Sequence, residues 1–387
     1  MNIDPAVHRR PHLVSPAARR RVPLVSPAVI AMIIMVLLSG CKQDRSSDGR
    51  TFTDKAREIF ILNNLAETVS VYHPDSGQLY NNVFTTGRAP NDILFYNDSL
   101  YIVCSTDNTI EVYDETSFRK IGEIYLGPGN NPYSIIQGTG THSHIAYIPN
   151  FVSETVSVIN LNTLQLTGTI DPANPDILRR PQDGAVMGDY LFICNTDHDG
   201  SAPGDGSVAV FAAGAPYDHV ADILTGSGSN PQTALPLPAL EELHVYLTGD
   251  QTSDDGEILI LDVSSILAGG TGHTVTSRLP VGGSPAMTGS AWDSVSGTVF
   301  LTGTYGLYRY DALSGTLPAA PGANPVYELT DPSADLLSGV AFDGVNDILV
   351  VANFGEDSLL ILEGDDFSTR AALQASDGPL APHLFIE

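Results

Sequence analysis

The chain has 387 residues, of which 42% are hydrophobic and 16% charged, and it carries 36 Gly and 26 Pro. That length suffices for one large core or two smaller ones, and the Gly and Pro content predicts many turns rather than long helices. A formal net charge of −27 repels nucleic-acid phosphates, so the composition argues against a DNA- or RNA-binding protein.

The first forty residues have the order of an export signal. A basic head with five arginines precedes a long uncharged stretch, which is typical of a secretory signal peptide. The stretch is also long enough for a signal anchor that spans a bilayer. It ends in Leu38, Ser39, Gly40 and Cys41, which resemble the bacterial lipobox. Residues 1–40 are therefore predicted to be a lipoprotein signal peptide, with a signal anchor or ordinary cleavage as the alternatives.

The lipobox resemblance implies a membrane anchor. In that family the thiol, here of Cys41, receives a diacylglycerol and the amine a further acyl chain such as palmitate, which together anchor a soluble domain durably. The next residue is Lys42 rather than the Asp that retains many such proteins at the inner membrane, so the outer membrane or cell surface is favoured. Residues 41–57 are predicted to form a flexible tether. Without residues 1–40, the chain holds 13 basic and 44 acidic residues, a net charge of −31.

One pattern then recurs seven times. An apolar run is followed by a short polar break and an alternating run such as "ETVSV", which starts at Glu67 and again at Glu154. The apolar runs start 41 to 55 residues apart, at Ile59, Leu100, Ile145, Leu191, Leu243, Thr298 and Ile348. A period in this range, with several short strands in each unit, predicts an all-β, seven-bladed β-propeller over residues 58–387.

Each unit is expected to be a four-stranded blade with two apolar faces, which only neighbouring blades can cover. The apolar run is typical of a strand buried on both faces. The alternating run is predicted to lie farther out, with one face buried. Trp292 is assigned to an inner strand and to the core.

An inner strand follows a proline in most units. The prolines are Pro90, Pro132, Pro181, Pro231 and Pro285, and the sixth unit departs from the pattern. The C-terminal stretch 382–387, with Pro382, has no apolar run after it, whereas the run at Ile59 has no such strand before it. We therefore expect residues 382–387 to complete the blade formed by 59–84, which leaves no open sheet edge.

These segments resemble the YVTN-type repeat of bacterial and archaeal surface propellers, in which a Tyr-Val-Thr-Asn run precedes a Thr-Val-Ser-Val-Ile-Asp run. The Asn position holds Asn63, Asn150, Asn195 and Asn353. The resemblance implies a seven-bladed propeller outside the cell and says little about chemistry. Cys104 and Cys194 fall on equivalent strands two blades apart, too far for a disulfide, so both are predicted to be free thiols.

The mouth of the central channel is the expected binding surface of such a ring. Residues next to the repeated prolines offer carboxylate, imidazole, amide and guanidinium groups that can bind a polar ligand. They are Asn91, Asp92, Tyr133, Gln182, Asp183, Gln232, His383, Arg88, Arg179 and Arg180. The alternative interpretation is that they are turn caps and solvated strand ends.

Metal and catalytic motifs are sparse. Asp197, Asp199 and Asp205 offer oxygen ligands for Ca²⁺, although their spacing does not match an EF-hand loop, and an exposed turn is the alternative. His142 and His144 can chelate a metal or simply lie in a loop. No nucleophile elbow, zinc-protease motif or Cys-x-x-Cys-His sequence occurs, so no catalytic residue and no cofactor besides Ca²⁺ is predicted.

The sequence favours a lipid-anchored, extracytoplasmic propeller that acts as a binding module or scaffold for a protein or saccharide partner. The alternative is a periplasmic enzyme or ligand sensor that uses the channel mouth, as some propeller lactonases and lyases do, and a quinone or haem propeller is a third. An enzyme is expected to cluster ionisable groups with shifted pKa values at one mouth. A scaffold is expected to spread its functional surface over outer loops.

Replacing the predicted lipidation site tests the anchor. The Cys41→Ser variant is expected to move from the membrane fraction to the soluble fraction, because a hydroxyl cannot take the thioether-linked lipid on which the attachment depends. Cell fractionation with immunodetection measures the distribution, and Cys104→Ser is the matched control. Unchanged membrane attachment of Cys41→Ser would contradict the lipoprotein assignment.

Overall fold

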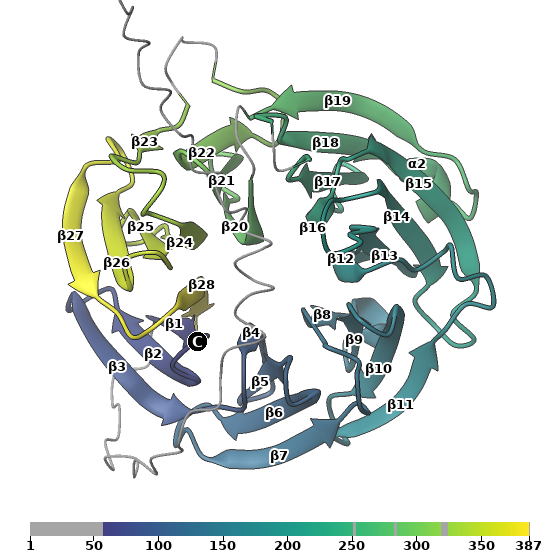
Figure 1. Cartoon of the computed structure of the whole chain (residues 1–387), viewed down its shortest axis with the longest axis horizontal. Coiled ribbons are helices and arrows are strands. Elements are labelled where there is room, and N and C mark those ends of the chain that lie inside the picture. The colour runs from purple at the N-terminus through teal and green to yellow at the C-terminus, as the bar shows by residue number, and fades with distance from the viewer. Residues whose placement is uncertain (1–56, 251–252, 282–284, 319–323, 387) are drawn as a thin grey trace, which may run out of the picture.

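The computed structural model describes residues 57–250, 253–281, 285–318 and 324–386. The predicted signal peptide, the lipobox with Cys41 and most of the tether therefore lie outside the described residues. In the described part, no helix is long and apolar enough to cross a bilayer. The described strands form seven four-stranded antiparallel sheets arranged around a common axis (Figure 1), which confirms the seven-bladed propeller.

The first four blades hold these strands, given from the axis outward. Blade 1 holds β28 (Pro379–Ile386), β1 (Arg57–Asn63), β2 (Thr68–His73) and β3 (Gln78–Thr85). Blade 2 holds β4 (Pro90–Tyr96), β5 (Ser99–Cys104), β6 (Thr109–Asp114) and β7 (Lys120–Tyr125). Blade 3 holds β8 (Ile136–Gln137), β9 (Ile145–Asn150), β10 (Thr155–Asn160) and β11 (Gln165–Ile170). Blade 4 holds β12 (Pro181–Met187), β13 (Tyr190–Asn195), β14 (Asp205–Ala212) and β15 (His219–Ser227).

The other three blades follow the same order. Blade 5 holds β16 (Pro231–Leu237), β17 (Glu242–Leu247), β18 (Glu257–Asp262) and β19 (Thr274–Pro280). Blade 6 holds β20 (Pro285–Asp293), β21 (Thr298–Gly303), β22 (Gly306–Asp311) and β23 (Tyr327–Glu328). Blade 7 holds β24 (Leu337–Asp343), β25 (Ile348–Asn353), β26 (Ser358–Glu363) and β27 (Thr369–Gln374). Two short helical turns lie in connections between the described strands: η1 (Gly140–His142) between β8 and β9, and α2 (Ser264–Leu267) between β18 and β19.

The two faces of the ring differ in what they carry. Inner strands start at the face that holds the repeated prolines, which we call the proline face, and run to the opposite face. Arg57, at the start of β1, pairs there with Ile386, at the end of β28. We call this opposite face the terminal face, because both ends of the described chain lie on it.

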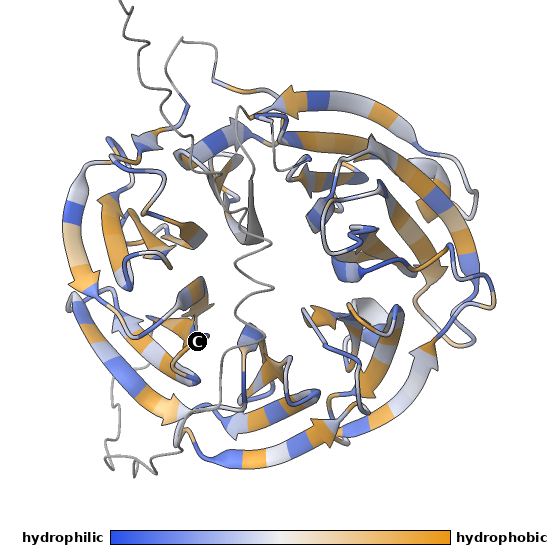
Figure 2. Ribbon diagram, in the orientation of Figure 1, coloured by the Kyte–Doolittle hydropathy of each residue, from blue (hydrophilic) through white to orange (hydrophobic). Residues whose placement is uncertain are grey.

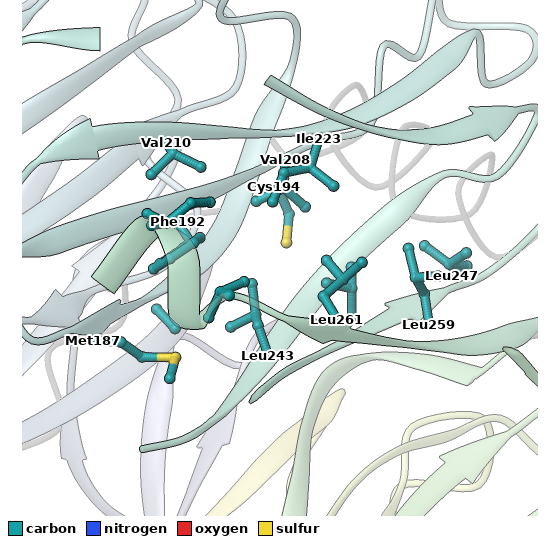
Figure 3. Close-up of a cluster of buried hydrophobic side chains, with 14 residues drawn as sticks. Met187, Phe192, Cys194, Val208, Val210, Ile223, Leu243, Leu247, Leu259 and Leu261 are labelled. Carbon is teal, nitrogen blue, oxygen red and sulfur yellow. The ribbon is translucent and has the colours of Figure 1, made fainter. Parts of the chain in front are cut away.

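The core consists of seven clusters among the described residues, and each cluster fills the space between two neighbouring blades. Figure 3 shows the cluster between blades 4 and 5, where Phe192 and Val210 of blade 4 face Leu243 and Leu261 of blade 5. Apolar residues colour the inner three strands of most blades, whereas the outermost strands alternate (Figure 2). Burial between blades, at about 25 cal/mol per Å² of apolar surface, is therefore what stabilises the ring.

The C-terminal strand closes the ring as predicted, but it starts earlier. β28 begins at Pro379 rather than at Pro382, and Pro379 pairs with Asn63, the last residue of β1. Pro379, which follows Gly378 at a positive φ of 68°, is thus the equivalent of the repeated prolines. The sequence offered two prolines three residues apart, and the pairing with β1 rather than proline spacing selects the first.

The alternating strands are buried on both faces, which corrects the expectation of one buried face. Ser70 in β2 is 0% exposed and Ser157 in β10 is 1% exposed. An asparagine side chain makes this burial tolerable: Nδ2 of Asn63 donates to Ser70 Oγ at 2.8 Å, and Nδ2 of Asn150 donates to Ser157 Oγ at 2.9 Å. The Asn of the repeat therefore satisfies hydroxyls that would otherwise be buried without partners.

Two further expectations have opposite outcomes. Cys104 and Cys194 are both free and buried, which confirms the prediction for the thiols. Trp292 does lie on an inner strand, β20, but its side chain is 40% exposed, so its assignment to the core is wrong. It lies one residue from the turn that follows β20.

Removing the closing strand tests the ring. Deletion of residues 379–387 leaves an edge of β1 unpaired and uncovers its apolar side chains, so the melting temperature should fall by on the order of 10 °C. Differential scanning calorimetry measures the change, and deletion of Glu387 alone is the control. A deletion variant that melts like the wild type would show that closure by β28 is not needed.

Candidate functional site

Three inner strands, β4, β12 and β16, begin in the same unusual way. The residue before the first proline has a positive φ, of 52° at Ala89, 51° at Arg180 and 51° at Asn230. Residues other than glycine rarely adopt this conformation, and a residue before proline normally stays extended. Backbone strain of this kind, which costs of order 1 kcal/mol, persists only where the surrounding structure holds it.

A β-bulge follows each of these prolines. A bulge inserts one unpaired residue and re-aims the side chains next to it. The unpaired bulge residues are Asn91, Gln182 and Gln232. The residues that rejoin the ladder directly after them are Asp92, Asp183 and Thr233. The fold thus presents one such pair of positions in each of blades 2, 4 and 5, where the inner strand begins on the proline face.

Asp92 is held by two blades. Its Oδ1 accepts the N–H of Ile93 at 2.8 Å, and its Oδ2 accepts the N–H of Ile135 in blade 3 at 2.9 Å. Burial raises the pKa of the Asp92 carboxyl to about 7, the charge of Asp183 adds to the rise, and the two backbone hydrogen bonds oppose it. At neutral pH this carboxyl is therefore present in both protonation states.

Asp183 occupies the equivalent position two blades further on. The hydroxyl of Thr233 in blade 5 donates to its Oδ2. Burial raises the pKa of Asp183, whereas the hydrogen bonds from Thr233, the Gly184 backbone and Ser134 lower it. Ser134 also reaches the backbone carbonyl of Gln182 at 3.1 Å, so blade 3 is linked to blade 4 at this point.

His383 approaches Asp92 from the closing strand. Its Nε2 lies 3.6 Å from Asp92 Oδ1 and has no hydrogen-bond partner among the described residues. Burial lowers the pKa of His383 to about 4, so the imidazole is neutral at pH 7. Of the side chains, 26% of His383 and 23% of Asp92 remain exposed, yet enough protein surrounds them for burial to dominate both pKa shifts.

Tyr133 completes the group from blade 3. Burial raises its pKa to about 12, a hydrogen bond with Gln182 lowers it, and the charge of Asp183 raises it further. Its phenol is therefore protonated at neutral pH. We refer to the linked set as the axial cluster, which consists of Asp92, Tyr133, Gln182, Asp183, Thr233 and His383.

Two predicted site residues hold inner strands in place and are not part of the axial cluster. Asn91 accepts a hydrogen bond from Asn64 of blade 1 at 3.0 Å and donates to Ser105 in its own blade. Gln232 is 3% exposed, and its Nε2 donates to Asn230 Oδ1 at 2.7 Å. Both residues thus fix the ends of inner strands, which was the alternative interpretation of these positions.

The three arginines do not join the axial cluster. Arg88 forms an ion pair with Asp107 at 2.6 Å. Arg179 pairs with Asp197 at 3.0 Å, and Arg180 with Glu154 at 3.4 Å. Each guanidinium is held by a loop carboxylate of the proline face, so none of the three neutralises Asp92 or Asp183 directly.

The structure gives the predicted calcium loop other roles. Asp197 accepts the N–H of Asp205 at 3.0 Å in addition to its arginine partner. Asp199 accepts the N–H groups of Ser201 and Ala202 within its own turn. No group of three or more His, Cys, Asp or Glu among the described residues could hold a metal ion, and this includes His142 and His144.

Sequence reasoning missed two members of this region, Ser134 and Thr233. Both stand two residues after a repeated proline, Pro132 and Pro231, which is the position of Asp92 in blade 2. Aligning the units on their prolines would have marked them. Small hydroxyl residues were overlooked because, without the structure, their type alone does not distinguish them from turn residues.

Asp92→Asn tests the raised pKa through stability. The folded protein keeps a proton on Asp92 up to about pH 7, whereas the unfolded chain releases it near pH 4, so folding loses stability as the pH rises between these values. The Asn variant lacks this loss. Its free energy of unfolding should exceed that of the wild type by on the order of 2 kcal/mol at pH 8 and by nothing at pH 4.

Urea denaturation at both pH values measures this difference, and the exposed Asp218→Asn is the control. His383 destabilises the fold in the opposite direction, as the pH falls from 6.5 through about 4, and it does so in both proteins. A gain for Asp92→Asn that is the same at pH 4 and pH 8 would contradict the raised pKa.

Comparisons with known proteins support the fold and leave the family open. No family model matches the chain, and no curated protein matches it, so the YVTN resemblance stays a prediction. Among solved structures, the chain is similar to a Lactobacillus plantarum protein, with a TM-score of 0.64, 14% identity, and coverage of 85% of this chain and 99% of that one. It is also similar to Kuenenia stuttgartiensis hydrazine synthase, with a TM-score of 0.63, 14% identity, and coverage of 85% of this chain and 99% of that one. A third similar structure is a protein of Bacteroides uniformis that is described as a candidate 6-phosphogluconolactonase. Its TM-score is 0.61 at 12% identity, with coverage of 86% of this chain and 100% of that one.

Proposed function

We propose that this protein is a lipid-anchored, extracytoplasmic propeller that binds a small organic cation at the axial cluster. The observation that carries the proposal is a pair of carboxylates that form no ion pair with a Lys or Arg of the described part of the chain. The pKa values of Asp92 and Asp183 are both raised, and burial is the largest cause of each shift. The charge of Asp183 adds to the shift of Asp92. A bound ammonium or guanidinium group would relieve this unfavourable charge.

The surroundings of the two carboxylates support the same ligand class. His383 and Tyr133 are neutral at pH 7, because burial lowers the pKa of the first and raises that of the second. Arg88, Arg179 and Arg180 are paired with other carboxylates. Among the described residues of the cluster, an anionic ligand would therefore meet two carboxylates and no cation, whereas a cation finds two carboxylates and neutral polar groups that can accept its N–H bonds.

The clustering of shifted groups at one end of the ring favours a small ligand over a large scaffold surface. The scaffold role for a protein or saccharide partner stays a prediction. The neighbours of known structure include proteins described as enzymes, but at identities of 14% or less they support the fold alone.

A second candidate function, proton transfer to a bound substrate, rests on Asp92. A carboxyl with a pKa of about 7 suits general acid–base catalysis at neutral pH. Enzymatic turnover would be recognised by product formation with a pH profile that changes in Asp92→Asn. Binding without turnover leaves the ligand unchanged.

Ligand binding is tested with agmatine and putrescine as cationic probes and with glucuronate and phosphate as anionic ones. Isothermal titration calorimetry should detect binding of the cations only. The affinity should increase about tenfold between pH 6 and pH 8, because Asp92 loses its proton over this range and each unit of proton linkage is worth a factor of ten.

Matched variants make the result specific. Asp92→Asn combined with Asp183→Asn should weaken cation binding about 10- to 100-fold, since each removed carboxylate gives up a charge-assisted hydrogen bond. Asp218→Asn should bind like the wild type. Tighter binding of the anions, or equal cation binding by the double variant, would sink the proposal.

A further inference from the structure

The described chain enters the ring on the terminal face, beside blade 7. The guanidinium of Arg57 pairs with Asp75 at 2.7 Å and lies 3.6 Å from Asp343. Asn346, in the turn after Asp343, donates to Asp75 at 3.0 Å. Arg57, the first described residue, therefore lies next to the turn that joins β24 to β25.

Three turns on this face share one construction. In each, an Asp Oδ1 accepts the backbone N–H of the residue two positions later: Asp293 that of Val295, Asp311 that of Leu313 and Asp343 that of Val345. Such Asx-turns lift the second residue away from the sheet. Val295 is 94% exposed, Val345 is 72% exposed and Leu313 is 56% exposed.

Other blades place polar residues at the tips of similar turns. The second residue after Asn160 in blade 3 is Asn162, and the second residue after Asp262 in blade 5 is Ser264, with the same backbone hydrogen bond in each. Apolar tips of this construction are therefore a feature of blades 6 and 7 among the described turns. Blade 7 packs against blade 1, where the described chain begins at Arg57, and blade 6 packs against blade 7.

The exposed Trp292 extends the same surface. It precedes Asp293 in β20, and Leu313 lies against the turn after Asp293, since a Cβ added at Gly297 would come within 2.6 Å of Leu313 Cδ1. We call Trp292, Val295, Leu313 and Val345 the terminal-face patch. Among the described residues, Leu240 in the β16–β17 turn of blade 5 is also exposed on the terminal face. The remaining exposed large apolar side chains lie on outer strands or on the proline face, and they are Ile121, Tyr125, Val152, Leu166, Leu224 and Val275.

We propose that the terminal-face patch rests on the headgroup region of the membrane to which Cys41 attaches the protein. This inference depends on the lipid anchor of the proposed function. Residues 41–56 separate the anchor from Arg57, and sixteen residues reach at most about 55 Å when fully extended. The lipid thus holds the patch at a high effective concentration near the bilayer, where a few apolar contacts suffice.

The chemistry of the patch fits a lipid surface. Tryptophan prefers the boundary between headgroups and acyl chains, because its ring is apolar and its N–H is polar. The carboxylates of Asp293, Asp311 and Asp343 lie at the base of the turns, so the tips can touch the headgroups without deep insertion. Docking in this orientation points the proline face, with the axial cluster, away from the membrane.

The single tryptophan of the chain makes a direct test possible. Residues 41–387 are coupled through Cys41 to a maleimide lipid in phosphatidylcholine vesicles, and Cys104 and Cys194 are too buried to compete. Part of the phosphatidylcholine carries a nitroxide on its headgroup. Trp292 emission is expected to fall roughly twofold relative to vesicles without the nitroxide, because an indole held at the headgroup region lies near the quencher.

Matched variants separate docking from simple attachment. Val295→Ser combined with Val345→Ser should restore the emission, whereas Leu224→Ser, an equally exposed residue on outer strand β15, should leave the quenching intact. Absence of quenching in the attached wild type, or equal quenching in the double variant, would overturn the proposal. Because the attachment here is chemical, this outcome is independent of whether cells lipidate Cys41.

Discussion

The ring depends on the burial of each blade between two others. A four-stranded sheet with two apolar faces has no stable state alone, since one or both faces would meet water. Seven such sheets cover each other completely only when the first and last also meet. The pairing of β28 with β1 provides that contact, and it places Phe385 beside Phe95 of blade 2, with ring centroids 4.9 Å apart. Closure is therefore both a sheet interaction and a packing interaction.

The same closure assembles the axial cluster. His383 belongs to the closing strand, whereas Asp92 and Asp183 belong to blades 2 and 4, so the group exists only in the complete ring. Polar side chains inside the blades are also paired with one another. Hydroxyls of the third strands are buried, and asparagines at the ends of the second strands satisfy them. The repeat motif is thus a hydrogen-bond motif within an apolar sheet. Its Asn, Ser and Thr side chains can be buried because they are hydrogen-bonded to one another.

The blade count, the closing strand and the axial placement of Asp92 and Asp183 could be predicted from the sequence, because they follow from period, hydrophobicity and the position after a proline. The start of β28 could not, since Pro379 and Pro382 satisfy the same local rule and only the pairing with β1 separates them. The exposure of Trp292 could not be predicted for a similar reason. The sequence indicated its strand, but not how close Trp292 lies to the end of that strand. The pairing of Arg179 with Asp197 depends on a loop conformation that no periodicity encodes.

The two faces of the ring differ in a way that follows from chain direction. An inner strand that runs from the proline face must end on the terminal face. The bulges that position Asp92 and Asp183 therefore lie on the first face, and the Asx-turns that follow the inner strands lie on the second. Closure by a C-terminal inner strand then forces Arg57 and Ile386 onto the second face as well. Any attachment through the N-terminus consequently pulls on the face that lacks the axial cluster. A protein built in this way can be held at a surface while its charged site remains open to the surrounding solution.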